Sequence, residues 1–241
     1  MKKNYLKQYN TIKKILGIED IISIRFSDEK TSDFIKHNDT VCTAMARCFI
    51  KNKYTFIDRH AGQLCVGGNY FLNIKKYSDE EVSKTYVKNE QVFKNEKSCG
   101  VFLKKIPPYP KQVQRRYVLF SPLKKEQHKP DVVMMLATPA QVGRILGLSV
   151  FKIFSDPLVV PSGSTCMSVY APLSSGKIHL NFIDYFDRYY QGKQGKKLLW
   201  SDNQMIVSMT NQMFEEIIKN IQLSAHGSFE AKVDPQKVDK I

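Results

Sequence analysis

The chain has 241 residues, of which 42% are hydrophobic and 11% aromatic, a composition that supports a folded protein with a sizeable core. No stretch reaches the roughly 18 apolar residues that a membrane span needs, so no transmembrane helix is expected. The polar N-terminal residues also argue against a signal peptide. Five irregularly spaced cysteines indicate free thiols or ligands rather than disulfides. We therefore expect a cytoplasmic protein.

The formal net charge of +14 has two interpretations. Lysines that coat a solvated surface explain it without any partner. A polyanionic partner is the alternative, because basic residues gather at 104–105, 115–116, 124–125 and 193–197. The last group follows Tyr189 and Tyr190, which could stack on bases. No nucleic-acid-binding motif accompanies these groups, so nucleic acid is kept as an alternative partner only.

Hydrophobic periodicity predicts interleaved helices and strands. The expected helices span residues 4–16, 40–52, 69–74, 79–105, 139–152 and 211–221. The expected strands span residues 21–26, 54–57, 117–120, 132–136, 158–160, 178–182 and 205–209. Few spacings give strand-helix-strand crossovers, which indicates one α+β domain over residues 1–225 with a mixed sheet of about six strands. The polar residues 226–241 are expected to form a disordered tail.

Three local patterns sharpen these assignments. Thr138-Pro139-Ala140-Gln141 has the composition of a capping box with proline at the first helical position. Asp39 is the expected N-cap of the helix over 40–52, which places Cys42 at its third position. In the strand over 178–182, strict alternation predicts that Ile178, Leu180 and Phe182 point inward and that His179 and Asn181 point outward.

Three cysteines share a placement near an expected helix start. Cys42 and Cys166 fall in the first turn of a helix, and Cys65 lies just ahead of one. Helix N-termini carry partial positive charge and unpaired N–H groups, which lower the pKa of a thiol and attract anions. The three segments together would suit a thiolate, a metal or a small anion. The alternative is that the cysteines are small buried hydrophobic residues.

A catalytic role is a second hypothesis for Cys65. His60 and Asp58 precede it closely, and the amides of Gly67 and Gly68 could stabilise an oxyanion. Cys65 would then be a nucleophile or redox thiol of low pKa, and the protein a cysteine-dependent enzyme. Serine-hydrolase and nucleotide-binding motifs do not occur.

From about Gly17 to Gln222 the chain resembles the cysteine-rich archaeal family called domain of unknown function 169. The resemblance rests on Cys65-Val66-Gly67-Gly68, on Lys129-Pro130-Asp131-Val132-Val133 through Gln141, and on Ser162-Gly163-Ser164-Thr165-Cys166. It implies a shared fold and a cysteine-bearing site, and it supplies no activity. The chain departs from the family pattern at Val66, at Phe186, and at Asp184, where members often carry a fourth cysteine.

These observations give one site hypothesis: a small anionic ligand, cofactor or metal binds in a cysteine-lined pocket. Its expected residues are Cys42, Cys65, Gly67, Gly68, Cys166, Asp184 and Arg188. A metal would use Cys42, Cys65, Cys166 and Asp184, although no paired ligand spacing supports it. Asp184 is expected to orient Arg188 towards the thiols, because residues four apart share one face of a helix. The cofactor and the oligomeric state are left open.

Overall fold

Eight strands form one mixed sheet in the order β2-β3-β4-β1-β5-β10-β7-β6. The computed structural model describes residues 5–36, 40–152, 156–160, 165–183, 187–188, 193–194, 197–198 and 200–227, with backbone only at 160, 193–194 and 197–198. The strands of the sheet are β1 (Ile21–Ser27), β2 (Ile35–Lys36), β3 (Thr55–Asp58), β4 (Tyr117–Pro122), β5 (Val132–Ala137), β6 (Leu158–Val160), β7 (His179–Asn181) and β10 (Met205–Thr210). Both edge strands run parallel to their neighbours, and the other pairings are antiparallel.

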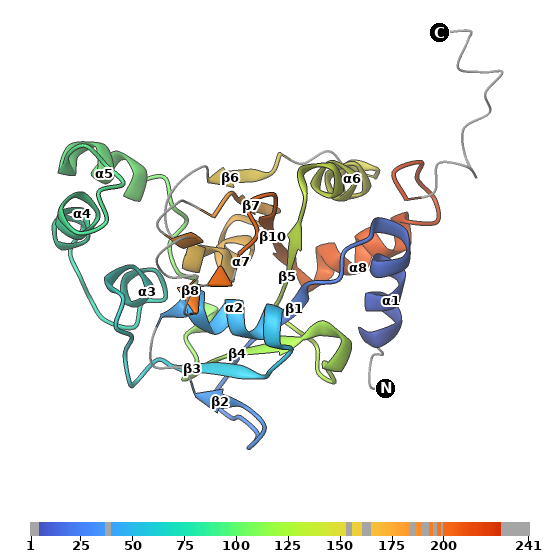
Figure 1. Cartoon of the computed structure of the whole chain (residues 1–241), viewed down its shortest axis with the longest axis horizontal. Helices are drawn as coiled ribbons and strands as arrows, with labels where there is room; N and C mark the ends of the chain where they lie inside the picture. The colour runs from blue at the N-terminus through green and yellow to red at the C-terminus, as the bar shows by residue number, and fades with distance from the viewer. Residues whose placement is uncertain are drawn as a thin grey trace, which may run out of the picture.

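Helices cover both faces of this sheet (Figure 1). They are α1 (Tyr5–Leu16), α2 (Val41–Lys51), α3 (Val66–Phe71), α4 (Asp79–Lys88), α5 (Glu96–Leu103), α6 (Pro139–Val150), α7 (Ala171–Ser175) and α8 (Asn211–Asn220). Three short 3-10 turns join them, η1 (Lys111–Val113), η2 (Leu123–Lys125) and η3 (Thr165–Val169). Two further short strands, β8 (Lys193–Gln194) and β9 (Lys197–Leu198), pair with each other.

Strand β5 shows how the two faces are filled. Val132, Met134 and Leu136 join the core beneath α2, η3 and α7, whereas Val133 and Met135 join the core beneath α1, α6 and α8. All six residues of β5 are buried. Successive side chains of a strand point to opposite faces, so a strand that is apolar at every position needs cover on both sides. The fold is therefore α+β with a mixed sheet, as the sequence predicts.

The sheet has eight strands rather than about six. The outermost strands, β2 and β6, contribute two and three residues. The strand predicted over 158–160 is confirmed as β6, whereas β2 was not predicted, because two residues carry no alternation that a sequence could show. Short edges also limit unwanted pairing with other chains.

Several helix boundaries differ from the predicted ones. The cap of α2 is Thr40, whose hydroxyl accepts a hydrogen bond from the Thr43 amide at 3.1 Å, so Cys42 takes the second helical position. Asp39 lies outside the described residues. Helix α3 begins at Val66, because Cys65 caps it and both glycines are helical. The single helix predicted over 79–105 is two helices, α4 and α5, each with its own N-cap.

The predicted orientation of the strand over 178–182 is wrong for its polar residues. His179 and Asn181 are 0% and 2% exposed, whereas Phe182 is 45% exposed. Ile178 and Leu180 are buried as predicted, on the opposite face of the sheet. The register pairs His179 with Ser208 on β10, beneath η3. Helices cover the sheet on both sides. The alternation of polar and apolar side chains in this strand therefore separates two buried faces, and neither face is exposed to solvent.

The capping box at the start of α6 is confirmed. The Thr138 amide donates to Gln141 Oε1 at 2.8 Å, and the Gln141 amide donates to Thr138 Oγ1 at 3.4 Å. We expect Thr138→Ala to lower the free energy of unfolding by about 1 kcal/mol, because an N-terminal amide loses its acceptor. Urea denaturation measures this loss. Thr85→Ala, which removes an exposed hydroxyl within α4, is the control and should change stability by less than about 0.5 kcal/mol. Equal losses in both variants would contradict the capping role.

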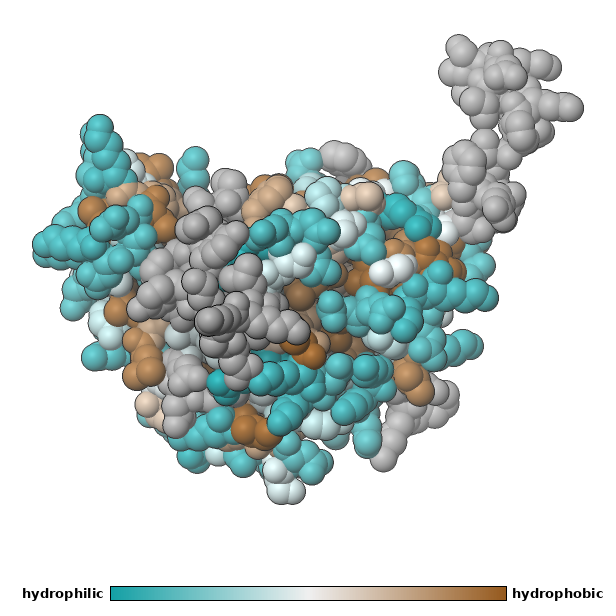
Figure 2. Space-filling view, viewed as in Figure 1, coloured by the Kyte–Doolittle hydropathy of each residue, from teal (hydrophilic) through white to brown (hydrophobic). Residues whose placement is uncertain are grey.

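The described part of the chain continues through Gly227. Arg144 donates to the carbonyl oxygens of His226 and Gly227 at 2.8 and 2.9 Å, so these two residues of the predicted tail are held against α6. The rest of that tail, residues 228–241, lies outside the described residues. Within the described ranges, no helix combines the length and hydropathy that crossing a bilayer requires. Figure 2 shows hydrophilic residues over most of one face of the molecule.

Candidate functional site

Three of the five cysteines meet on one side of the sheet. Cys42 comes from α2, Cys65 caps α3, and Cys166 lies in η3. The side chains of Cys42 and Cys166 are hydrogen-bonded to each other, and Cys65 interacts electrostatically with both. We call Cys42, Cys65 and Cys166 the thiol cluster. It joins segments more than 100 residues apart in sequence.

A buried carboxylate completes the cluster. Asp187 is 8% exposed, and its Oδ1 accepts a hydrogen bond from the Cys42 thiol at 3.5 Å. Its Oδ2 accepts one from the Thr165 amide at 3.1 Å. The amide and thiol donors offset part of the cost of burying this carboxyl group.

The cluster favours neutral thiols. The hydrogen bond with Cys166, burial and the nearby Asp187 raise the pKa of Cys42 well above its usual value. Burial, followed by the proximity of Cys166, also raises the pKa of Cys65, against the opposing effect of the Gly68 amide. Removing a thiolate from water is costly when no positive charge compensates it. The direction is opposite to the low pKa hypothesised for a Cys65 nucleophile.

The turn that carries Cys65 is tightly packed. Cys65 Sγ accepts a hydrogen bond from the Gly68 amide at 3.1 Å, so that amide already has a partner. A Cβ atom at Gly68 would lie 3.0 Å from Val41 Cγ2, the first residue of α2. Glycine at this position therefore allows the starts of α2 and α3 to approach closely, while Gly67 is also buried in the same turn.

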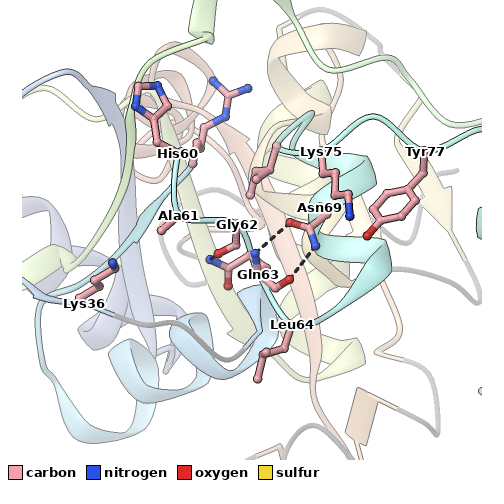
Figure 3. Close-up of a pocket in the computed structure, with 11 residues that line it drawn as sticks. Lys36, His60, Ala61, Gly62, Gln63, Leu64, Asn69, Lys75 and Tyr77 are labelled. Atoms are coloured by element: carbon pink, nitrogen blue, oxygen red, sulfur yellow. Dashed lines mark hydrogen bonds between the residues drawn. The ribbon is translucent and has the colours of Figure 1, made fainter.

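A pocket of about 660 Å³ opens beside the loop that precedes Cys65 in the sequence (Figure 3). We call it the basic pocket. It is lined by Lys36, Arg59, His60, Ala61, Gly62, Gln63, Leu64, Asn69, Ile74, Lys75 and Tyr77. Lys36 and Lys75 flank the loop over 60–64 from either side. Three of these side chains are lysine or arginine and none is acidic, so the lining carries a net positive charge.

Asn69 and Arg59 hold the walls of the basic pocket. Asn69 accepts from the Gln63 amide at 2.9 Å and donates to the Gln63 carbonyl at 2.7 Å, which closes the loop on α3. Arg59 donates to the carbonyl oxygens of Leu72, Asn73 and Arg115 at 3.1, 2.9 and 2.9 Å. Its guanidinium therefore ties three backbone segments together, whereas the ammonium groups of Lys36 and Lys75 are on exposed side chains.

The remaining predicted site residues have different surroundings. Arg188 is 8% exposed and donates to the carbonyl oxygens of Phe182, Ser201 and Gln204, at 2.8 Å to Phe182 and 3.0 Å to Gln204. These bonds fasten backbone segments. Asp184 lies outside the described residues, so its predicted pairing with Arg188 stays a prediction. His60 lines the basic pocket, and within the described residues no hydrogen bond joins it to Cys65.

The described residues contain no group of three or more His, Cys, Asp or Glu side chains arranged to hold a metal ion. Cys65 is engaged with its own helix, and Asp187 accepts from Cys42 and Thr165. The chemistry that the arrangement offers is therefore that of protonated thiols beside one carboxyl group, with a positively charged pocket on the neighbouring loop.

Sequence reasoning missed Asp187 and most of the basic pocket. Asp187 lies three residues beyond the predicted Asp184, in the same acidic and aromatic segment. Lys36, Arg59 and Lys75 are separated in sequence and sit in loops or short edge elements, where no periodic pattern groups them. The Arg59-His60 pair just ahead of the Cys65 turn was the one local signal for the pocket.

Together these features define an α+β protein with a thiol cluster, in which Cys42 and Cys166 are buried and Cys65 is half-buried, next to a basic pocket. The chain belongs to the domain of unknown function 169 family, described as uncharacterised ArCR, whose model matches residues 11–220. No curated protein and no solved structure matches the chain.

Proposed function

We propose that the protein binds a small anionic ligand in the basic pocket. The observation that supports this most directly is a pocket of about 660 Å³ whose lining has three lysine or arginine side chains and no acidic one. Its volume is within the range of about 300–1,000 Å³ that is usual for small-molecule sites. Concave sites with charges of one sign concentrate ions of the opposite sign.

The arrangement of the cations supports direct contact with a ligand. Arg59 is committed to backbone carbonyl oxygens and fixes the wall, so Lys36 and Lys75 are the residues proposed to bind. The Lys75 ammonium lies 5.1 Å from the centre of the Tyr77 ring, which positions it at the pocket. Lysine presents a mobile point charge with three donors, which suits phosphate or carboxylate groups of varied geometry.

Titration calorimetry with inorganic pyrophosphate at low ionic strength tests the proposal. We expect the wild-type protein to bind, with an affinity that falls as salt is added. Lys36→Ala and Lys75→Ala should each weaken binding about tenfold, because a hydrogen bond to a charged group contributes about 1.5–3 kcal/mol.

Lys88→Ala is the matched control, since it removes an exposed lysine from the last turn of α4 and leaves the pocket intact. It should bind pyrophosphate as the wild type does. Absence of binding by the wild-type protein, or equal weakening in all three variants, would reject the basic pocket as the site.

Two alternatives are distinguished from this proposal. A cysteine-dependent enzyme would require Cys65 to ionise readily, and the raised pKa of its thiol does not support that. A nucleic-acid-binding protein would use the basic residues of 193–197, whose side chains are not among those that the structure describes. Binding of an oligonucleotide that survives the loss of both Lys36 and Lys75 would favour this second alternative.

A further inference from the structure

A second cavity, of about 380 Å³, is lined in part by Tyr70, Phe71 and Asn73, which follow Cys65 in the sequence. We call it the aromatic pocket. Its lining includes the half-buried Tyr70 and Tyr109, the buried Phe71 and Tyr170, and the prolines Pro107 and Pro108. We propose that the aromatic pocket binds a planar aromatic molecule that carries a carboxylate or similar anionic group.

The walls of this pocket are held rigidly by contacts within the protein. Tyr109 donates from its hydroxyl to the Val113 carbonyl at 2.9 Å, and its ring lies 5.2 Å from that of Tyr170, centre to centre. Ser174 Oγ donates to the Pro108 carbonyl at 2.5 Å, and Tyr70 donates to Asp79 at 2.7 Å. Proline and fixed aromatic rings lose little conformational freedom when a ligand binds, which favours affinity.

The shape and chemistry of the lining indicate the class of ligand. Aromatic rings pair in offset or edge-to-face geometry, so the half-buried Tyr70 and Tyr109, backed by the buried Phe71 and Tyr170, favour another planar ring. At the rim, Lys111 and Gln114 are exposed, and the lining contains no acidic side chain. Arg59 also lies behind Tyr109, with its guanidinium 4.9 Å from the ring centre. These positive charges favour an anionic substituent over a cationic one.

The test uses 2-naphthoate, with acetate as the ligand that has the carboxylate without the rings. We expect calorimetry to show 2-naphthoate binding at least tenfold more tightly than acetate. Ile106→Trp places a large side chain at the wall of the pocket and should weaken 2-naphthoate binding at least tenfold. Val101→Trp adds the same side chain at a 53% exposed position of α5 that does not line the aromatic pocket, and it should leave binding unchanged.

A second variant covers the case in which Ile106→Trp disturbs folding. Lys111→Glu changes an exposed side chain at the rim, and it should weaken 2-naphthoate binding while leaving neutral 2-naphthol binding unchanged. The Lys36→Ala, Lys75→Ala double variant should bind 2-naphthoate as the wild type does, because those lysines belong to the other pocket. The proposal is overturned if 2-naphthoate binds no more tightly than acetate. It is also overturned if the Lys36→Ala, Lys75→Ala double variant loses 2-naphthoate binding while Ile106→Trp and Lys111→Glu both keep it.

Discussion

Replacement of Phe120 by alanine is expected to lower the free energy of unfolding by about 3–5 kcal/mol, the largest stability effect foreseen for a single residue of this protein. Phe120 lies in β4, is fully buried, and pairs in register with Ile24 on one side and Thr55 on the other. Truncation removes apolar contacts and leaves a cavity that the surrounding sheet cannot close, because strands on both sides fix the backbone.

Urea denaturation of the wild type and of Phe120→Ala measures this loss. The same truncation at Phe151, which is 49% exposed at the end of α6, is the matched control and should change stability by less than about 1 kcal/mol. A loss below about 1 kcal/mol at Phe120 would mean that this part of the core is more loosely packed than the structure shows.

Stability is expected to fall in mildly acidic solution because of His179. Burial lowers the pKa of this imidazole from 6.5 to about 4, and neither of its ring nitrogens has a hydrogen-bond partner within the described residues. Below pH 6.5 the unfolded chain takes up a proton at His179 that the folded chain refuses. The folded state therefore loses about 3 kcal/mol relative to the unfolded state as the pH falls from about 6.5 to about 4, since one pKa unit corresponds to about 1.4 kcal/mol.

The measurement compares urea denaturation at pH 7.5 and pH 4.5 for the wild type and for His179→Gln, whose side chain stays neutral throughout. The variant should lose the pH dependence that His179 supplies, so the wild type should lose about 2–3 kcal/mol more than the variant between pH 7.5 and pH 4.5. If both proteins show the same change in stability between these pH values, His179 titrates normally in the folded state and the interpretation of its burial is wrong.

The sequence carried reliable information wherever a local physical rule acts alone. Thr138 and Gln141 form a capping box in any helix that begins there, because both hydrogen bonds lie within four residues. The apolar run of β5 similarly requires a strand covered on both faces. Gly17, with a φ of +69°, ends α1 because glycine enters the left-handed region without steric cost.

The local rules failed where neighbours outside the segment decide the outcome. His179 and Asn181 alternate with apolar residues as a half-exposed strand would, yet η3 covers them. Cys65 was expected ahead of a helix that follows the two glycines, whereas its own side chain caps the helix and draws both glycines into it. Neither η3 nor the start of α2 can be placed beside these residues from the sequence alone.

The sequence by itself determined the class of fold, most of the elements and the three cysteines of interest, because periodicity, caps and glycine positions are local properties. Only the tertiary structure decided that Cys42, Cys65 and Cys166 meet at Asp187, and that Lys36 and Lys75 face one pocket. Contacts of this kind, between residues far apart in the sequence, depend on how the sheet and the helices that cover it bring distant loops together. That arrangement is fixed by the packing of the whole core, which no short stretch of sequence specifies.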